Sequence, residues 1–189
     1  MADHDALPDR LERERCVLVV IDIQERFRNL IHGIEDVLDG TSRLIRFCQQ
    51  LDIPILVTEH YPRGLGVTVP ELRGLIRPFK PLEKIHFSCA LDAGFGEALP
   101  ATGRDQVILA GIESHVCVYQ TAFDLVRRDL QVAVAADAVS SCSNRNRLLG
   151  LDRMRDVGAQ IMGSQMIMFE ILRQAGTPDF KAVAPLLKN

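Results

Sequence analysis

Short apolar runs alternate with helix-like patterns along most of this 189-residue chain. Apolar, β-branched blocks predict buried strands at residues 17–21, 53–57, 107–110, 132–135 and 159–162, with a shorter strand at Ile85 and Phe87. Apolar residues three and four positions apart predict helices at residues 41–51, 114–130, 143–154 and 164–172. Ser114 and Ser143 are candidate N-caps, and Thr41 or Ser42 is expected to open the first helix.

The strand runs lack polar alternation, which indicates a sheet buried on both faces. Strands that alternate with helices favour an α/β fold with a doubly wound, mostly parallel sheet and helices on both faces, and the length fits a single domain over residues 1–189. In such folds, ligands bind beyond the carboxyl ends of the strands. Residues 59–82 are rich in Gly and Pro, which predicts a functional loop such as a lid.

The composition excludes several classes of protein. Hydrophobic residues make up 47% and charged residues 25%, so a disordered chain is not expected. A net charge of −3 and the lack of Trp disfavour a nucleic-acid partner. No apolar run reaches the ~18 residues of a membrane helix, and the charged N-terminus does not resemble a secretory signal. Phosphate-loop and dinucleotide motifs are missing, so no cofactor is expected.

The five cysteines are odd in number and form no Cys-x-x-Cys pair. This pattern disfavours a disulfide framework or a zinc ribbon and favours a reducing cytoplasm. It also leaves a cysteine free to act as a nucleophile. Four of the five lack a suggestive placement and are interpreted as core or incidental residues: Cys16, Cys48, Cys89 and Cys142.

Cys117 is the exception. The segment from Gly111 to Val118 leads from a predicted strand through a Gly turn into a predicted helix. If Ser114 is the N-cap, Cys117 lies in the first helical turn, where free N–H groups and the helix dipole stabilise a thiolate. The alternative is that Cys117 is only a small buried apolar side chain.

Two further polar residues lie at predicted strand ends. Asp22 directly follows the first apolar run, and the apolar residues after it would suit its carboxylate to proton transfer. Lys84 lies between the long loop and the short strand, where an ammonium group could stabilise a thiolate and position a base. The alternatives are a turn or N-cap aspartate and a solvated surface lysine.

With these residues in place, the sequence resembles the isochorismatase-like cysteine hydrolase superfamily. The likeness rests on Val19 to Gln24, on Lys84, and on the segment from Gly111 to Val118. The loop motif from Val57 to Gly66 is similar to that of the isochorismatase-domain-containing hydrolases, whose substrates are largely unassigned.

The resemblance implies a six-stranded, three-layer, Rossmann-like sheet and an Asp-Lys-Cys triad carried by Asp22, Lys84 and Cys117. It also implies a cis peptide bond at Ile112–Glu113 and an oxyanion hole formed by the N–H groups of Glu113 and Cys117. By family position, Phe27 would form an apolar wall of the substrate site, with plain core packing as the alternative.

The sequence also departs from the pattern of its relatives. Nicotinamidases of the superfamily carry an Asp-x-His metal motif with further histidines after the second strand, whereas this chain offers only Glu59 and His60 there, so no metal is expected. His60 stands where the related branch usually has Gln, and it is a candidate substrate contact.

These observations favour a cysteine-nucleophile hydrolase acting on a small amide or related acyl compound through a thioester. The alternatives are isochorismatase-type vinyl-ether hydrolysis and a non-catalytic scaffold or binding protein. The resemblance also implies a homo-oligomer, and the helix from Met166 to Leu172 is either an interface or core. If the site is functional, Cys117 should alkylate well below about pH 8 and lose that reactivity on Asp22→Asn or Lys84→Ala.

Overall fold

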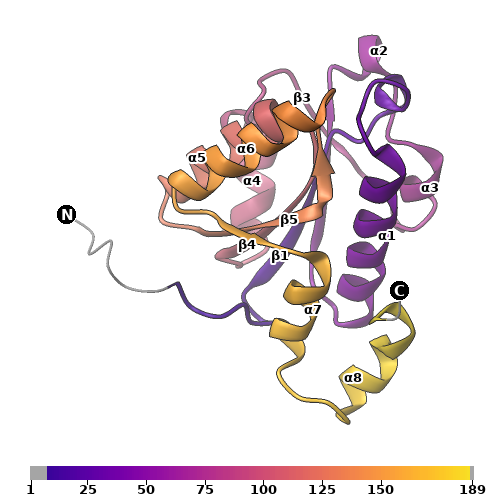
Figure 1. Ribbon diagram of the computed structural model, residues 1–189, viewed down its shortest axis with the longest axis vertical. Helices are drawn as coiled ribbons and strands as arrows, with labels where there is room; N and C mark the ends of the chain where they lie inside the picture. Colours follow the sequence, from indigo (N-terminus) through magenta and orange to yellow (C-terminus); the bar gives the residue numbers. More distant parts are fainter. Residues whose placement is uncertain (1–7, 188–189) are drawn as a thin grey trace.

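A six-stranded parallel sheet forms the centre of the molecule, which we describe over residues 8–187 of a computed structural model (Figure 1). The strand order is β3-β2-β1-β4-β5-β6, which confirms the predicted α/β class. The strands are β1 Cys16–Ile21, β2 Ile55–His60, β3 Leu82–Lys84, β4 Gln106–Ile112, β5 Gln131–Ser140 and β6 Gln160–Met162. The helices are α1 Ile34–Gln50, α2 Pro62–Leu65, α3 Pro70–Arg73, α4 Ala93–Ala101, α5 Tyr119–Val126, α6 Asn144–Asp156, α7 Ser164–Leu172 and α8 Pro178–Val183.

Helices cover both faces of this sheet, α1, α7 and α8 on one side and α4, α5 and α6 on the other (Figure 1). Successive residues of β1 belong to opposite faces: Leu18 and Val20 pack in the core beneath α1, whereas Val17 and Val19 pack in the core beneath α5 and α6. Because both faces are buried, the strand reads as a continuous apolar run. No helix within residues 8–187 is both long and apolar enough to cross a bilayer.

The strand order places the carboxyl ends of β1 and β4 side by side, where the winding of the chain reverses. Gly111 of β4 pairs with Ile21 of β1, and a Cβ atom on Gly111 would lie only 2.1 Å from the Ile21 carbonyl oxygen. The backbone of Gly111 also has φ +129°, which L-residues with side chains rarely adopt. Glycine therefore permits the close approach of the two strands that carry Asp22 and Cys117.

Several predicted boundaries were wrong. Strands β2 and β5 extend to His60 and Ser140 rather than to residues 57 and 135, and α5 ends at Val126 rather than at residue 130. Helix α1 begins at Ile34 rather than at Thr41, because Gly33 precedes it in a left-handed conformation and Val37 and Leu38 extend its buried face; Thr41 lies inside the helix. The third strand is Leu82–Lys84, which pairs with β2. Ile85 and Phe87, where the strand was predicted, are 69% and 51% exposed.

The remaining differences have local causes. The loop predicted over residues 59–82 contains the end of β2 and two one-turn helices, α2 and α3, each with Pro in its first turn. Helix α4 was missed because it holds Gly94, Gly96 and Pro100, residues that disfavour helices. The predicted N-cap Ser143 is confirmed, since its side chain accepts a hydrogen bond from the Asn146 N–H.

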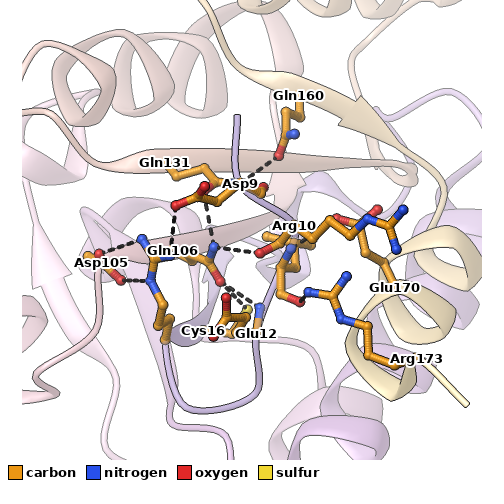
Figure 2. A network of polar contacts seen from close by, with 12 residues as sticks. Asp9, Arg10, Glu12, Cys16, Asp105, Gln106, Gln131, Gln160, Glu170 and Arg173 are labelled. Atoms are coloured by element: carbon orange, nitrogen blue, oxygen red, sulfur yellow. Dashed lines mark hydrogen bonds and ion pairs between the residues drawn. The ribbon is translucent and has the colours of Figure 1, made fainter. Parts of the chain in front are cut away.

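The amino edge of the sheet is closed by its own polar network (Figure 2). Gln106 Nε2 donates to Gln131 Oε1, and Gln131 Nε2 donates to Gln160 Oε1, each at 3.0 Å. The same glutamines bind the N-terminal segment, where Gln106 accepts from the Glu12 N–H and donates to the Arg10 carbonyl. The side chains at this edge thus satisfy one another, in contrast to those at the carboxyl edge.

Candidate active site

Asp22 is held at the end of β1 by groups from the two neighbouring strands. Its backbone is left-handed (φ 53°), a conformation that Asp tolerates better than most residues, and the residue is 1% exposed. Thr58 Oγ1 of β2 donates to Asp22 Oδ1 at 2.8 Å. Lys84 Nζ, at the end of β3, lies 2.7 Å from Asp22 Oδ2. Residues 22 and 84, far apart in sequence, thus form a buried ion pair.

The ammonium group of Lys84 is also held by the backbone after β3. Nζ donates to the carbonyl oxygens of His86 and Phe87, both at 3.1 Å. Burial is the largest single effect and would lower the pKa of Lys84. The charges of Asp22, Cys89 and Cys117 and a hydrogen bond to Asp22 together outweigh it, so the pKa is raised above its ordinary value. Lys84 is therefore a buried cation and not the solvated surface lysine that sequence reasoning left open.

Cys117 lies in a π-helical turn, Ser114–Val118, that follows β4 and leads into α5. Ser114 is not the N-cap that the sequence suggested: Glu113 takes that position, and Ser114 Oγ lies 2.7 Å from Ser141 Oγ. Helix α6 packs closely on this turn, since a Cβ atom on Gly150 would lie 2.6 Å from the Ser114 carbonyl carbon. Cys117 is 7% exposed.

The thiol of Cys117 differs from the stabilised thiolate that the sequence suggested. Burial raises its pKa above the ordinary value, the charge of Asp22 and a hydrogen bond to it raise the pKa further, and the charge of Lys84 opposes them. These effects on the thiol pKa outweigh the stabilisation of a thiolate that was expected from the start of a helix. The raised pKa favours a protonated thiol beside a carboxylate at rest, and it disfavours the predicted alkylation of Cys117 well below about pH 8.

The peptide bond Ile112–Glu113 is cis, as the resemblance implied. It joins the end of β4 to the π-helical turn. Glu113 continues away from the sheet and accepts a hydrogen bond from the Cys142 N–H through Oε2 at 2.7 Å.

Two polar atoms near Lys84 are buried without a hydrogen-bond partner, His60 Nδ1 and Ser88 Oγ. Such atoms are rare in folded proteins, and at the carboxyl edge of a sheet they mark positions that a ligand can satisfy. The ring of His60 lies 5.4 Å from that of Phe87, and burial and the nearby Lys84 lower the pKa of the imidazole. Phe27 follows Asp22 in the 3₁₀ turn Glu25–Phe27 and packs, half-buried, against the core beneath α1.

Sequence reasoning missed the residues that hold the loop after β2. Gln24 donates from Nε2 to the His60 carbonyl oxygen and accepts from the His60 N–H. Glu59, which is 3% exposed, accepts from both the N–H and the hydroxyl of Thr68. The Thr58 hydroxyl is the one signal visible in the sequence, as a polar group at the end of an apolar strand. The hydrogen-bond partners of Gln24, Glu59 and Thr58 come together only in the folded chain.

Asp22, Lys84 and Cys117 do not line the cavity of about 370 Å³ beside the start of α1. That cavity is bordered by residues of α1, β5 and α6, among them Asp36, Asp137 and Arg147. Cys117, at 7%, is the most exposed of the three candidate catalytic residues.

The sequence of this chain is similar to that of known proteins over most of its length. The profile of the isochorismatase domain matches residues 16–166. Isochorismatase domain-containing protein 2 of Danio rerio is 38% identical over 180 residues, which cover 95% of this chain and 90% of that protein. A secreted isochorismatase effector, Isc1 of Phytophthora sojae, is 36% identical and aligns over 95% of this chain and 88% of its own length.

Solved structures share the fold. The MAR1 ribonuclease of Caenorhabditis elegans superposes with a TM-score of 0.89 at 36% identity, over 95% of this chain and 92% of that one. The YcaC protein of Escherichia coli, described as an octameric hydrolase of unknown specificity, superposes with a TM-score of 0.89 at 24% identity, over 96% and 91% of the two chains.

Proposed function

This chain belongs to the isochorismatase family of hydrolases, and on that basis we propose that it hydrolyses a small amide or related acyl compound with Cys117 as the nucleophile. One observation carries the proposal: a carboxylate and a lysine, paired at 2.7 Å and both almost fully buried, lie beside a buried thiol whose pKa is raised by burial and then by the charge of the carboxylate. A cysteine that only fills space needs neither charged neighbour.

In the proposed first half-reaction, Asp22 accepts the Cys117 proton as the sulfur attacks the substrate carbonyl. The oxyanion is stabilised by the N–H groups of Glu113 and Cys117. As the C–N bond breaks, protonated Asp22 donates to the leaving nitrogen, and an amine and a thioester remain. Lys84 stays protonated throughout and stabilises each negative charge that forms beside it.

In the second half-reaction, Asp22 removes a proton from water, which attacks the thioester. The C–S bond breaks, the proton returns to sulfur, and a carboxylic acid leaves. His60 Nδ1 and Ser88 Oγ are the groups available to bind polar atoms of the substrate, because both are buried without a partner. Phe27 is proposed as an apolar wall of the same site. No cofactor or metal ion takes part in these steps.

Other activities remain as outcomes of the test. Vinyl-ether hydrolysis of the isochorismatase type would need a proton donor but no nucleophilic sulfur. A non-catalytic scaffold would bind small molecules without turnover. Ribonuclease activity, named for one structural relative, would need RNA to approach a chain whose net charge is −3.

The decisive experiment incubates the purified chain with a panel of small amides, ureides and acyl compounds and follows both turnover and intact protein mass. The expected result is turnover with a transient acyl adduct on Cys117, and loss of both in Cys117→Ala. Cys48→Ala, a change in a buried cysteine of α1, serves as the control that retains turnover. Turnover that persists in Cys117→Ala contradicts the nucleophile and favours vinyl-ether chemistry.

We further propose that the chain is a homo-oligomer in a reducing compartment. All five cysteines are free, which supports a reducing environment, although one relative is named a secreted effector. An oligomer is supported by the octameric relative and by exposed apolar side chains on the segments that follow β2 and β3, Tyr61, Ile85, Phe87 and Leu91.

A further inference from the structure

A second group of reactive side chains lies at the carboxyl edge of the sheet, apart from the triad. Glu113 caps the π-helical turn, His115 lies within that turn, and Cys142 follows β5. Each offers one donor atom, and the three donor atoms lie within 4.8 Å of one another. Within the described residues, this is the one group of three or more His, Cys, Asp or Glu side chains with such spacing.

Hydrogen bonds already hold the three donors in place. Glu113 Oε2 accepts from the Cys142 N–H at 2.7 Å and lies 3.9 Å from His115 Nδ1. The side-chain amide of Asn146, on the first turn of α6, lies 3.4 Å from His115 Nε2 and 3.3 Å from Cys142 Sγ. Ser141 Oγ lies 3.0 Å from His115 Nδ1. The donors thus converge from two segments 29 residues apart, and Asn146 Nδ2 donates to Cys142 Sγ, a contact that would stabilise its thiolate.

We propose that Glu113, His115 and Cys142 form a binding site for Zn²⁺. A thiolate, an imidazole and a carboxylate are the ligands that zinc prefers, with bonds of about 2.0–2.3 Å. The separation of 3.9 Å between Glu113 Oε2 and His115 Nδ1 needs to shorten by about 0.6 Å for one tetrahedral ion to bind both, and Nδ1 must then give up its contact with Ser141 Oγ. The sulfur and nitrogen donors disfavour Mg²⁺ and Ca²⁺, which take oxygen ligands.

Access and charge fit this proposal. Cys142 is exposed, and Glu113 and His115 are half-buried, so an ion can enter from solvent and a water molecule can complete a four-coordinate shell. Cys142 binds as the thiolate and releases its proton to solvent. This site is distinct from the metal motif of nicotinamidases, which lies after the second strand, where Glu59 is already engaged by Thr68.

The test is titration of the purified full-length chain with Zn²⁺ alone by calorimetry, and with Co²⁺ by absorption spectroscopy. The expected results are one Zn²⁺ per chain and a thiolate-to-cobalt charge-transfer band. Cys142→Ser should abolish the band, and Cys142→Ser and His115→Ala should each weaken zinc binding at least about tenfold. Asn146→Ala, which removes a supporting contact, should weaken it by about tenfold or more.

Two control variants separate this site from other thiols and histidines. His86→Ala removes an exposed histidine beside Asp92 and should bind zinc like the native chain. Cys117→Ser should keep both the stoichiometry and the cobalt band, so the result does not depend on the proposed hydrolysis. The proposal is overturned if the native chain shows no saturable one-to-one binding, if Cys142→Ser binds as tightly as the native chain, or if the band is lost with Cys117 rather than with Cys142.

Discussion

In the proposed mechanism, Asp22 both restrains the Cys117 nucleophile and activates it. The negative charge of Asp22 helps to raise the pKa of the thiol, so little thiolate forms at rest, yet the same carboxylate is placed to accept the proton during attack. Lys84 offsets part of this effect, and its Nζ lies 2.7 Å from Oδ2 of the same carboxylate. At the residue scale, the site therefore favours concerted proton removal over a stored thiolate.

Asp22→Asn separates these two roles. The substitution removes the charge that raises the thiol pKa and frees Lys84, so alkylation of Cys117 by iodoacetamide at neutral pH should increase by about tenfold or more, whereas turnover should fall. This sign is opposite to the loss of reactivity that the sequence alone suggested for this variant. Site-resolved mass spectrometry measures the labelling, with exposed Cys142 as an internal reference.

Lys84→Ala should act in the other direction, because the lysine charge lowers the thiol pKa. Labelling of Cys117 at neutral pH should fall below that of the native chain, and the pH at which labelling becomes fast should move upward. Equal labelling of Cys117 in the native chain and in both variants would contradict the electrostatic coupling of the three residues.

At the scale of elements, the Asp22–Lys84 ion pair links the end of the short edge strand β3 to the end of the central strand β1. Lys84→Met leaves a buried carboxylate without its partner and should lower the free energy of unfolding by about 3–5 kcal/mol. The double variant Asp22→Asn/Lys84→Met removes both charges and should recover part of that loss. Urea unfolding of the four proteins of this cycle measures the coupling, and additive effects would contradict it.

The close approach of β1 and β4 gives a second prediction at this scale. Gly111→Ala would place a Cβ atom against the Ile21 carbonyl oxygen and force an unfavourable φ, so it should destabilise by about 4 kcal/mol or more. Gly96→Ala, in α4, is the matched control: no atom lies within 4 Å of its Cβ position, and the change should stabilise the helix by about 0.5–1 kcal/mol. Thermal unfolding distinguishes the two.

At the scale of the whole molecule, the two edges of the sheet differ in how their polar groups are satisfied. The amino edge is a closed network of glutamines and the N-terminal segment (Figure 2). The carboxyl edge carries buried His60 Nδ1 and Ser88 Oγ without partners. The first arrangement stabilises the fold, and the second leaves polar groups for a ligand.

Helix α7 extends this contrast to assembly. Ile167, Met168, Ile171 and Leu172 are buried, whereas Met166 and Phe169, three residues apart on the same side, are 59% and 48% exposed. The helix thus packs in the core and also leaves two large apolar side chains exposed. The core interpretation of its sequence is confirmed, and the interface stays a prediction.

If this face joins copies of the chain, Met166→Glu/Phe169→Glu should lower the mass measured by size-exclusion chromatography with light scattering. Charged side chains in an apolar interface lose solvation without gaining partners. Leu148→Glu/Leu149→Glu changes a similarly exposed pair on α6 and should leave the mass unchanged. A native chain that is monomeric, or a mass that falls equally in both variants, would contradict the role of α7.

The sequence by itself determined the class of fold and the candidates for chemistry. Runs such as residues 17–21 report burial on both sides of a strand. The local context of Asp22, Lys84 and Cys117, together with the family resemblance, made all three candidates for chemistry. These features are local, because they depend on neighbours within a few positions. The exact ends of helices and strands were predicted less well, as α1 and β3 show. Burial and strand pairing can override the local conformational preference of the residues.

The tertiary structure decided what those residues are as chemical groups. The protonation of Cys117 depends on burial and on charges brought from β1 and β3, which no local pattern encodes. The convergence of Glu113, His115 and Cys142 likewise arises because β4 and β5 are neighbours in the sheet. Electrostatics and coordination act through space, so they follow from the fold and not from spacing along the chain.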